Sequence, residues 1–343
     1  MTAAPEHAPT MARASLAERL GPHVPLLLIP ALVVLGFLAI PTTSSWLTLT
    51  VSGLAMGMMI FVMASGLTLV FGLMDVINFG HGAFVSVGAF VGISLLLVLE
   101  HMVAAPSLML NLTAMLVAIV GAMLATGAVG WAFERVIVKP VYGFHLKQIL
   151  VTMGGLIVAE QLIIVLWGPE EIFINRPAAL QGAVTFAGAA LEKYRLVAVG
   201  IGLVIFLAMR WVLRRTKIGL IVRAGVENGE MVEALGYRLR LVFVGVFIAG
   251  SALAGLGGVM WGLYQEVITA HMGNQIMILI FIVVIIGGLG SVEGCFIGAL
   301  LVGLMQNYVA FLEPKLALIS NIGLMVAILM WRPMGMIPVV KAK

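Results

Sequence analysis

The sequence predicts an all-α fold: a polytopic transmembrane helical bundle of about 8–10 spans, with broken or re-entrant helices and a weak internal repeat. The first observation is composition. Hydrophobic residues make up 62% of the 343 positions and charged residues only 10%, whereas a soluble domain carries about 25% charged residues. So few charges cannot cover a water-facing surface, and we therefore expect the bilayer to be the solvent of this chain.

The second observation is a series of apolar runs. Ten of them follow one another, at roughly 24–40, 46–71, 83–99, 108–132, 149–167, 196–212, 241–263, 276–289, 294–312 and 316–331. About 20 apolar residues cross the hydrocarbon core, and a broken helix needs fewer. Because the eighth run is short, it could merge or form a re-entrant pair with the ninth, so eight crossings remain an alternative to ten.

The third observation is the distribution of basic residues. With the N-terminus in the cytoplasm, all but four of the 19 Lys and Arg residues fall in cytoplasmic tails and loops. The four on the other side are Arg176, Lys193, Arg195 and Lys315. This asymmetry follows the positive-inside rule and places both termini in the cytoplasm. Basic residues in short loops do not form the continuous patch that nucleic acid requires.

The chain begins with a polar stretch, residues 1–23, which we expect to be a cytoplasmic tail. The run 24–40 resembles the core of a signal peptide, but it is long, contains Pro25 and Pro30, and precedes no small-x-small cleavage site. We therefore expect an uncleaved first span and a single transmembrane domain over residues 24–343. The lone Cys295 excludes a disulfide framework and a Cys-rich metal site, and is expected to be a packing residue.

The run ending near residue 71 is followed by a polar interruption at 72–82. It places Asp75, Asn78 and His81 between glycines. Glycine lets the backbone bend, and Asp or Asn side chains can satisfy the backbone groups that a bend frees. The segment is either a broken element beside a solute path, buried by protein or lined by water, or an ordinary cytoplasmic hairpin.

A second interruption, residues 286–294, lies between the eighth and ninth runs. Its glycines are followed by no Lys, so it is not a phosphate-binding Walker loop. We interpret it as a break between two half-helices. Residues 81–84 and 293–296 resemble one another, each opening a helix rich in small residues, and such paired breaks are typical of an internal repeat in transporters. Glycines and alanines in 53–66 and 250–258 predict close helix packing.

Glu160 lies within the fifth run. A carboxylate inside the membrane is costly, so it is either part of a solute path or the hydrogen-bond partner of a neighbouring helix. With the two interruptions, it completes a set of candidate path residues. They are Asn78, Phe79, His81, Gly82, Glu160, Gly288, Ser291 and Glu293. A catalytic role would need a cluster of His, Asp, Glu or Ser, and His81 with Asp75 is the one local candidate.

The charged loop 213–240 contains a short amphipathic helix. Asn228 can cap it, Glu230 sits favourably in its first turn and Gly236 can end it. Met231, Ala234 and Leu235 share one face. Charges surround this face, so it is suited to docking a soluble partner, although an interfacial helix lying on lipid is the alternative.

Together these segments resemble the membrane permease family of bacterial ABC importers for branched-chain amino acids, from about Val51 to the C-terminus. The resemblance rests on four ordered motifs and on a closing segment that also fits. They are residues 65–72 with 76–82, residues 218–224 with 234–237, residues 247–259, residues 287–294 and residues 331–335. The chain departs from the family pattern at Gly80 and Ala83, and has Val226-Glu227-Asn228 where Ala-Glu-Asp is usual; these departures bear on the substrate.

The resemblance implies a division of labour. The chain would be a bacterial inner-membrane transport subunit without an ATPase site or bound cofactor. It would pair with a second permease subunit, with two ATP-binding subunits that use ATP, and with an extracytoplasmic solute-binding protein. Residues 228–237 would couple ATP hydrolysis to the path. The solute would be small and neutral or zwitterionic, most simply a branched-chain amino acid. The alternatives are a urea or short-amide permease of this family, or a stand-alone secondary transporter.

Overall fold

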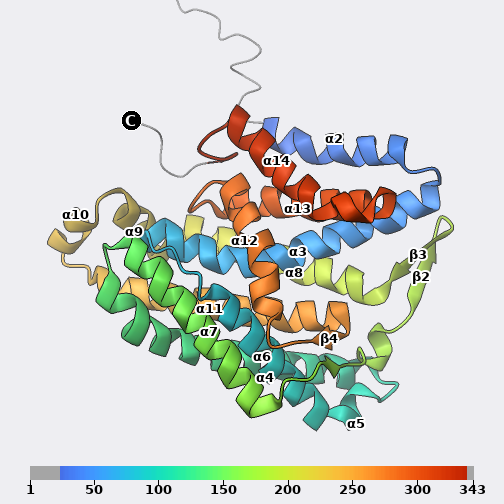
Figure 1. The fold of residues 1–343 in the computed structure, drawn as a ribbon, viewed down its shortest axis with the longest axis horizontal. Helices are drawn as coiled ribbons and strands as arrows, with labels where there is room; N and C mark the ends of the chain where they lie inside the picture. The colour runs from blue at the N-terminus through green and yellow to red at the C-terminus, as the bar shows by residue number, and fades with distance from the viewer. Residues whose placement is uncertain (1–23, 338–343) are drawn as a thin grey trace, which may run out of the picture.

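The computed structural model describes residues 24–337 and confirms the all-α prediction (Figure 1). The expected tail 1–23 lies outside the described residues. The α-helices are α2 (Val24–Ala39), α3 (Thr43–Met74), α4 (His81–Val98), α5 (Glu100–Val103), α6 (Leu108–Phe133), α7 (His145–Trp167), α8 (Lys193–Arg215), α9 (Lys217–Glu227), α10 (Gly229–Ala234), α11 (Leu239–Gln265), α12 (Met272–Gly287), α13 (Val292–Leu312) and α14 (Ala317–Trp331).

Short elements complete the chain. A π-helical turn η1 (Glu134–Val138) and a 3-10 turn η2 (Lys139–Val141) extend α6, and η3 (Ala178–Leu180) and η4 (Pro314–Leu316) lie in loops. The strands form two antiparallel pairs, β1 (Ile172–Phe173) with β4 (Val267–Ile268), and β2 (Ala183–Phe186) with β3 (Ala189–Glu192).

The helices have the lengths that membrane crossing requires. Within residues 24–337, 8 helices are long and apolar enough to span a bilayer, and α2 and α12 are shorter apolar helices. Each of the ten predicted runs coincides with one helix, so the predicted range of 8–10 spans is confirmed. The runs 276–289 and 294–312 are separate helices, α12 and α13, rather than one merged helix.

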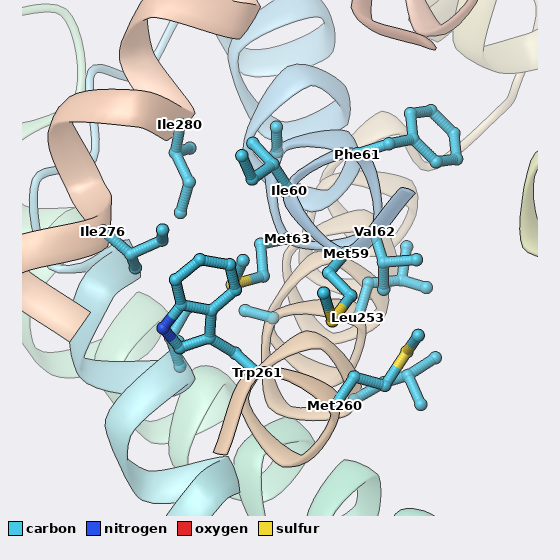
Figure 2. Close-up of a cluster of buried hydrophobic side chains, with 14 of the residues drawn as sticks. Met59, Ile60, Phe61, Val62, Met63, Leu253, Met260, Trp261, Ile276 and Ile280 are labelled. Atoms are coloured by element: carbon cyan, nitrogen blue, oxygen red, sulfur yellow. The ribbon is translucent and has the colours of Figure 1, made fainter. Parts of the chain in front are cut away.

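Helix α3 forms the centre of the bundle. Residues 59–64 are all fully buried, which means that the helix is covered around its whole circumference and not on one face alone. Figure 2 shows side chains of this stretch between Leu253, Met260 and Trp261 of α11 and Ile276 and Ile280 of α12. The sequence explains this position, because α3 is the longest helix and is apolar on every side.

Small residues allow the central helices to approach one another closely. A Cβ added at Gly66 would overlap the backbone of Gly250, and one at Gly88 would overlap the backbone of Gly255. A Cβ at Gly303 would likewise meet the backbone of Gly53. These contacts join α3 to α11 and α13, and α4 to α11. They confirm the packing role predicted for the glycines of 53–66 and 250–258, and Gly88 and Gly303 are their partners.

The bundle has two distinct ends (Figure 1). One carries α9 and α10 with the basic residues of 210–240, and we call it the basic end. The other carries the β2–β3 hairpin, and we call it the hairpin end. At the hairpin end, Arg176 is largely buried and donates hydrogen bonds to the carbonyls of Leu263 and Tyr264 at 2.9 Å. It also pairs with Glu192 and Glu266, so it fastens the loop 168–194 to α11.

Candidate functional site

The first interruption lies inside the bundle. After α3 ends at Met74, residues 75–80 run back without helix, and Asn78 is fully buried. Helix α4 then begins at His81, whose Nε2 lies 2.9 Å from the carbonyl oxygen of Met63. Met63 is roughly 16 Å back along α3 from its last residue, at 1.5 Å per residue. The chain thus makes a protein-covered break rather than an exposed hairpin, which is the arrangement a membrane tolerates.

The start of α4 meets the start of α12. A Cβ at Gly82 would touch the backbone of Gly273, and the Gly273 N–H donates to Ser86 Oγ at 3.0 Å. The Ser86 hydroxyl donates in turn to the carbonyl of Ala270 at 3.1 Å. Phe79 stacks obliquely on Phe281 of α12, with ring centroids 4.7 Å apart. Two helix N-termini therefore converge within the bundle, beside the residues predicted from the first interruption.

Glu160 has a partner that the sequence did not reveal. Its Oε2 lies 3.2 Å from Nδ1 of His271, the residue that precedes α12. Its Oε1 is buried without a hydrogen-bond partner among the described residues, as are both side-chain amide atoms of Asn78. Buried polar atoms without partners are rare and call for a functional or structural reason. The structure thus links Glu160 to the helix on which the first interruption packs.

The second interruption lies at the basic end. Gly288 and Gly290 have positive φ values of 97° and 81°, which end α12 and turn the chain into α13. Ser291 Oγ accepts a hydrogen bond from the Gly294 N–H at 3.1 Å and so caps α13. A Cβ at Gly72 would overlap Gly290, so the two interruptions meet there. The predicted path residues thus form two groups, one inside the bundle and one, Gly288, Ser291 and Glu293, at its basic end.

Glu293 joins two helices at this end. Its carboxylate pairs with Arg210 at 3.2 Å and with Arg214 at 2.7 Å, and both arginines belong to α8. The residues after α14 also reach this region. The N–H groups of Met336 and Ile337 donate to the carbonyls of Ile286 and Gly287, the last of α12. The motif 331–335 therefore turns the chain so that it completes the C-terminal end of α12.

A cavity of about 340 Å³ opens beside α12 toward the hairpin end. Its lining contains no charged side chain, and combines amides with aromatic and aliphatic groups. The residues are Met56, Trp261, Tyr264, Gln265, Met272, Gln275, Ile276, Leu279, Gln306, Asn307 and Ala310. Asn307 is held by hydrogen bonds from its Nδ2 to the Gly303 carbonyl at 2.9 Å and to Met56 Sδ at 3.4 Å.

Our sequence interpretation missed this cavity. The available signal was the presence of uncharged amides inside apolar helices, Gln275 in α12 and the pair Gln306–Asn307 in α13. Polar residues in spanning segments usually face the bundle interior or a water-filled path. The sequence did not show that α12 and α13 bring these amides, which are more than 30 positions apart in the chain, to the same cavity.

The short helix at the basic end has the predicted ends. Asn228 Oδ1 accepts a hydrogen bond from the Met231 N–H at 2.9 Å, and Gly236 follows the helix with a φ of 88°. Met231 and Leu235 are 58% and 70% exposed, and Ala234 is exposed beside them. Val232 points inward and is buried. Glu230 occupies the first turn, as expected. Helix α10 therefore presents an apolar face that nothing in residues 24–337 covers.

The candidate catalytic pair does not assemble. Asp75 is exposed and lies 3.6 Å from His145, whereas His81 is buried against the Met63 carbonyl. Within the described residues, no group of three or more His, Cys, Asp or Glu side chains could hold a metal ion. The structure offers instead polar cavities, broken helices and an exposed apolar helix face.

Spanning helices, two helix breaks and an uncharged polar cavity define a multi-pass membrane transport protein. The chain belongs to the family described as the permease component of branched-chain amino acid transport systems, whose model matches residues 49–329. The match covers every helix from α4 to α13 and most of α3 and α14. It includes both interruptions, the cavity and α10.

Curated relatives agree with this assignment. The chain is 27% identical to the high-affinity branched-chain amino acid transport system permease protein BraD of Pseudomonas aeruginosa, over 87% of this chain and 97% of BraD. It is 26% identical to LivH of Escherichia coli K12, which carries the same description, over 83% of this chain and 93% of LivH. A probable LivH of Methanocaldococcus jannaschii is 24% identical over 74% of this chain. No solved structure matches significantly.

Proposed function

We propose that this chain is the permease subunit of a bacterial ABC importer for branched-chain, hydrophobic amino acids. It spans the inner membrane with both termini in the cytoplasm, so that the basic end is cytoplasmic and the hairpin end faces outward. The family match and the descriptions of BraD and LivH support the transport role. The excess of Lys and Arg at the basic end supports the orientation.

The observation that carries the substrate proposal is the uncharged cavity beside α12. Amide side chains can donate hydrogen bonds to a carboxylate and accept them from an ammonium group. Its Met, Ile and Leu side chains offer apolar surface to an aliphatic side chain, and its volume of about 340 Å³ falls in the usual range for small-molecule sites. A zwitterion with an apolar side chain matches both parts of this lining, whereas urea leaves the apolar part unused.

The driving force comes from partner proteins. Two ATP-binding subunits use ATP, and one of them docks on the exposed face of α10. A second permease subunit completes the path, and an extracytoplasmic binding protein delivers solute at the hairpin end. The chain itself binds no cofactor. ATP-driven movement of α10 passes to α9 and from there to α8, which packs against it. Glu293 ties α8 to α13, and α13 carries Gln306 and Asn307 into the cavity.

Uptake in reconstituted vesicles tests the transport proposal. We expect the assembled importer to accumulate labelled leucine only when ATP is inside the vesicles and the loaded binding protein outside, because the chain has no energy source of its own. The chain alone, under a proton or sodium gradient, should give no accumulation. Gradient-driven uptake by the chain alone would establish a secondary transporter instead. Uptake of labelled urea with no competition from leucine would establish the short-amide alternative.

The cavity makes a separate prediction. Replacing Gln275 or Asn307 by Leu should lower the rate of leucine uptake roughly tenfold, because each change leaves a solute polar group without its partner, at a cost of about 1–3 kcal/mol. Asn274→Leu is the matched control, since Asn274 precedes Gln275 on α12 but does not line the cavity. Basal ATP hydrolysis should be unchanged in all three variants. Equal uptake by the Gln275 and Asn274 variants would show that the solute passes elsewhere.

A further inference from the structure

A second cavity lies at the basic end and has no part in the proposed transport path. It measures about 810 Å³ and lies between the end of α6 with η1 and η2 on one side and the α10–α11 connection on the other. Its lining is Trp131, Glu134, Arg135, Lys139, Glu233, Gly236, Tyr237, Arg238, Leu239, Arg240, Leu241 and Val244. Two membrane-spanning helices, α6 and α11, therefore meet the cavity at the level where each leaves the apolar region.

The charge of this cavity is unbalanced. Four basic side chains, Arg135, Lys139, Arg238 and Arg240, face two acidic ones, Glu134 and Glu233, which leaves a net charge of +2. Among the described residues, none of these four basic side chains forms an ion pair. In contrast, Arg176, Arg195, Arg210 and Arg214 each pair with a glutamate.

One of the two acidic groups is already engaged. Glu134 is buried and accepts a hydrogen bond from the Tyr142 hydroxyl at 2.8 Å. Burial, and then the hydrogen bond and negative charge of Glu134, raise the pKa of Tyr142, so the phenol keeps its proton and remains a donor. Arg240 acts on Tyr142 in the opposite direction, which places its guanidinium near the same group. Glu233 is exposed on α10. The arginines and the lysine therefore retain donors that no side chain of the described residues satisfies.

The apolar part of the lining identifies the side on which lipid lies. Trp131 of α6 is 49% exposed and Leu241 of α11 is 63% exposed. Trp131 precedes Arg135 by four residues, so both lie on one side of the α6–η1 helix with the indole toward the membrane. Exposed tryptophans of spanning helices sit at the headgroup level of the bilayer. A ligand with a negative head and an apolar body fits this order of side chains.

We propose that this cavity binds the phosphodiester headgroup of an anionic phospholipid. The phosphate accepts hydrogen bonds from Arg238 and Arg240 on α11 and from Arg135 and Lys139 on the α6 extension, and the acyl chains lie along Trp131, Leu241 and Val244. Basic pockets between spanning helices are a known means of holding anionic headgroups, and guanidinium groups match phosphate oxygens in geometry. The inference uses no feature of the amino-acid path and stands independently of the proposed solute.

Lipid binding to the delipidated importer, measured by native mass spectrometry, tests the site. The probes are phosphatidylglycerol, zwitterionic phosphatidylcholine and inorganic phosphate, added separately. We expect phosphatidylglycerol to bind this subunit at least tenfold more tightly than phosphatidylcholine. The double variant Arg238→Gln/Arg240→Gln should weaken phosphatidylglycerol binding roughly thirtyfold, because each of the two basic residues near an anionic lipid contributes about 1 kcal/mol and about 1.4 kcal/mol is tenfold in affinity. Inorganic phosphate should bind weakly and compete, since it lacks the acyl chains.

The matched control is Arg215→Gln/Lys217→Gln, which removes two exposed basic residues at the same end outside the cavity. It should bind phosphatidylglycerol as the wild type does. Equal binding of the two lipids, or unchanged binding by the Arg238/Arg240 variant, would overturn the proposal. Binding of phosphatidylglycerol only after removal of the ATP-binding subunits would also overturn the proposal. The cavity would then be a docking site for those proteins. Lys139→Gln, a single exchange in η2 rather than in α11, provides the same test if the double variant fails to fold.

Discussion

Replacing Leu235 by Asp is expected to abolish the stimulation of ATP hydrolysis by the loaded binding protein, while the chain remains folded in the membrane. Leu235 is 70% exposed at the end of α10, so the change removes no packing within this chain. In the importer that we propose, however, an ATP-binding subunit covers the exposed face of α10. A carboxylate without a partner then loses its hydration, at a cost of several kcal/mol. Stimulated and basal ATPase activities of the complex in vesicles measure the effect.

Leu146→Asp is the matched control. Leu146 is 79% exposed and lies in the first turn of α7, where an acidic residue is favourable. This variant should keep stimulated ATPase activity near that of the wild type, although both variants add the same charge at the basic end. If Leu235→Asp also retained full stimulation, α10 would not be the docking element. The interfacial alternative, in which α10 lies on lipid, would then replace it.

The second large effect is expected at Gly66. Its Cα faces Gly250 of α11 so closely that any side chain overlaps backbone, which cannot rotate away as a flexible side chain can. Gly66→Val should therefore separate α3 from α11 at the centre of the bundle. Overpacking of this kind costs about 3 kcal/mol, a large share of the stability of most proteins. We expect a strongly lowered unfolding midpoint in detergent and poor recovery of the subunit from membranes.

The control for this prediction is Gly154→Val in α7. Gly154 is also a helical glycine, but no atom lies within 4 Å of the Cβ that it would gain. The same change of residue type therefore tests the close contact separately from the general effect of a β-branched side chain in a helix. Similar unfolding midpoints for the two variants would mean that α3 and α11 can move apart freely, contrary to the packing described.

Much of the local structure was predictable because it depends on neighbours in the sequence. The apolar runs gave all ten helices to within a few residues, since hydrophobic length alone determines whether a segment can cross a bilayer. The cap at Asn228 and the turn at Gly236 were likewise predictable from short-range backbone preferences. The number of separate helices near 276–312 was not settled, because a glycine-rich break between apolar runs permits either a turn or a continuous helix.

The candidate path illustrates the limit of that approach. The interruption at 72–82 could be recognised as unusual, but the choice between a buried break and a surface hairpin depends on what covers it. In the structure, Met63 of α3 and helix α12 cover the interruption. These two segments lie on either side of the interruption in the sequence and are far apart from one another in the chain. Glu160 could be identified as a costly group, but its partner His271 could not, because 111 positions separate them.

The sequence by itself determined that this protein lives in a bilayer, where its spans begin and end, which family it resembles and which short helix has capped ends and an apolar face. Each of these follows from composition, apolar length, capping or an ordered set of motifs, all of which are local properties of the chain. Tertiary structure alone decided that the interruptions meet at Gly72 and Gly290, that amides of α12 and α13 share one uncharged cavity, and that four basic residues surround another. Packing of distant helices creates these sites, and glycine contacts between backbones fix which helices become neighbours.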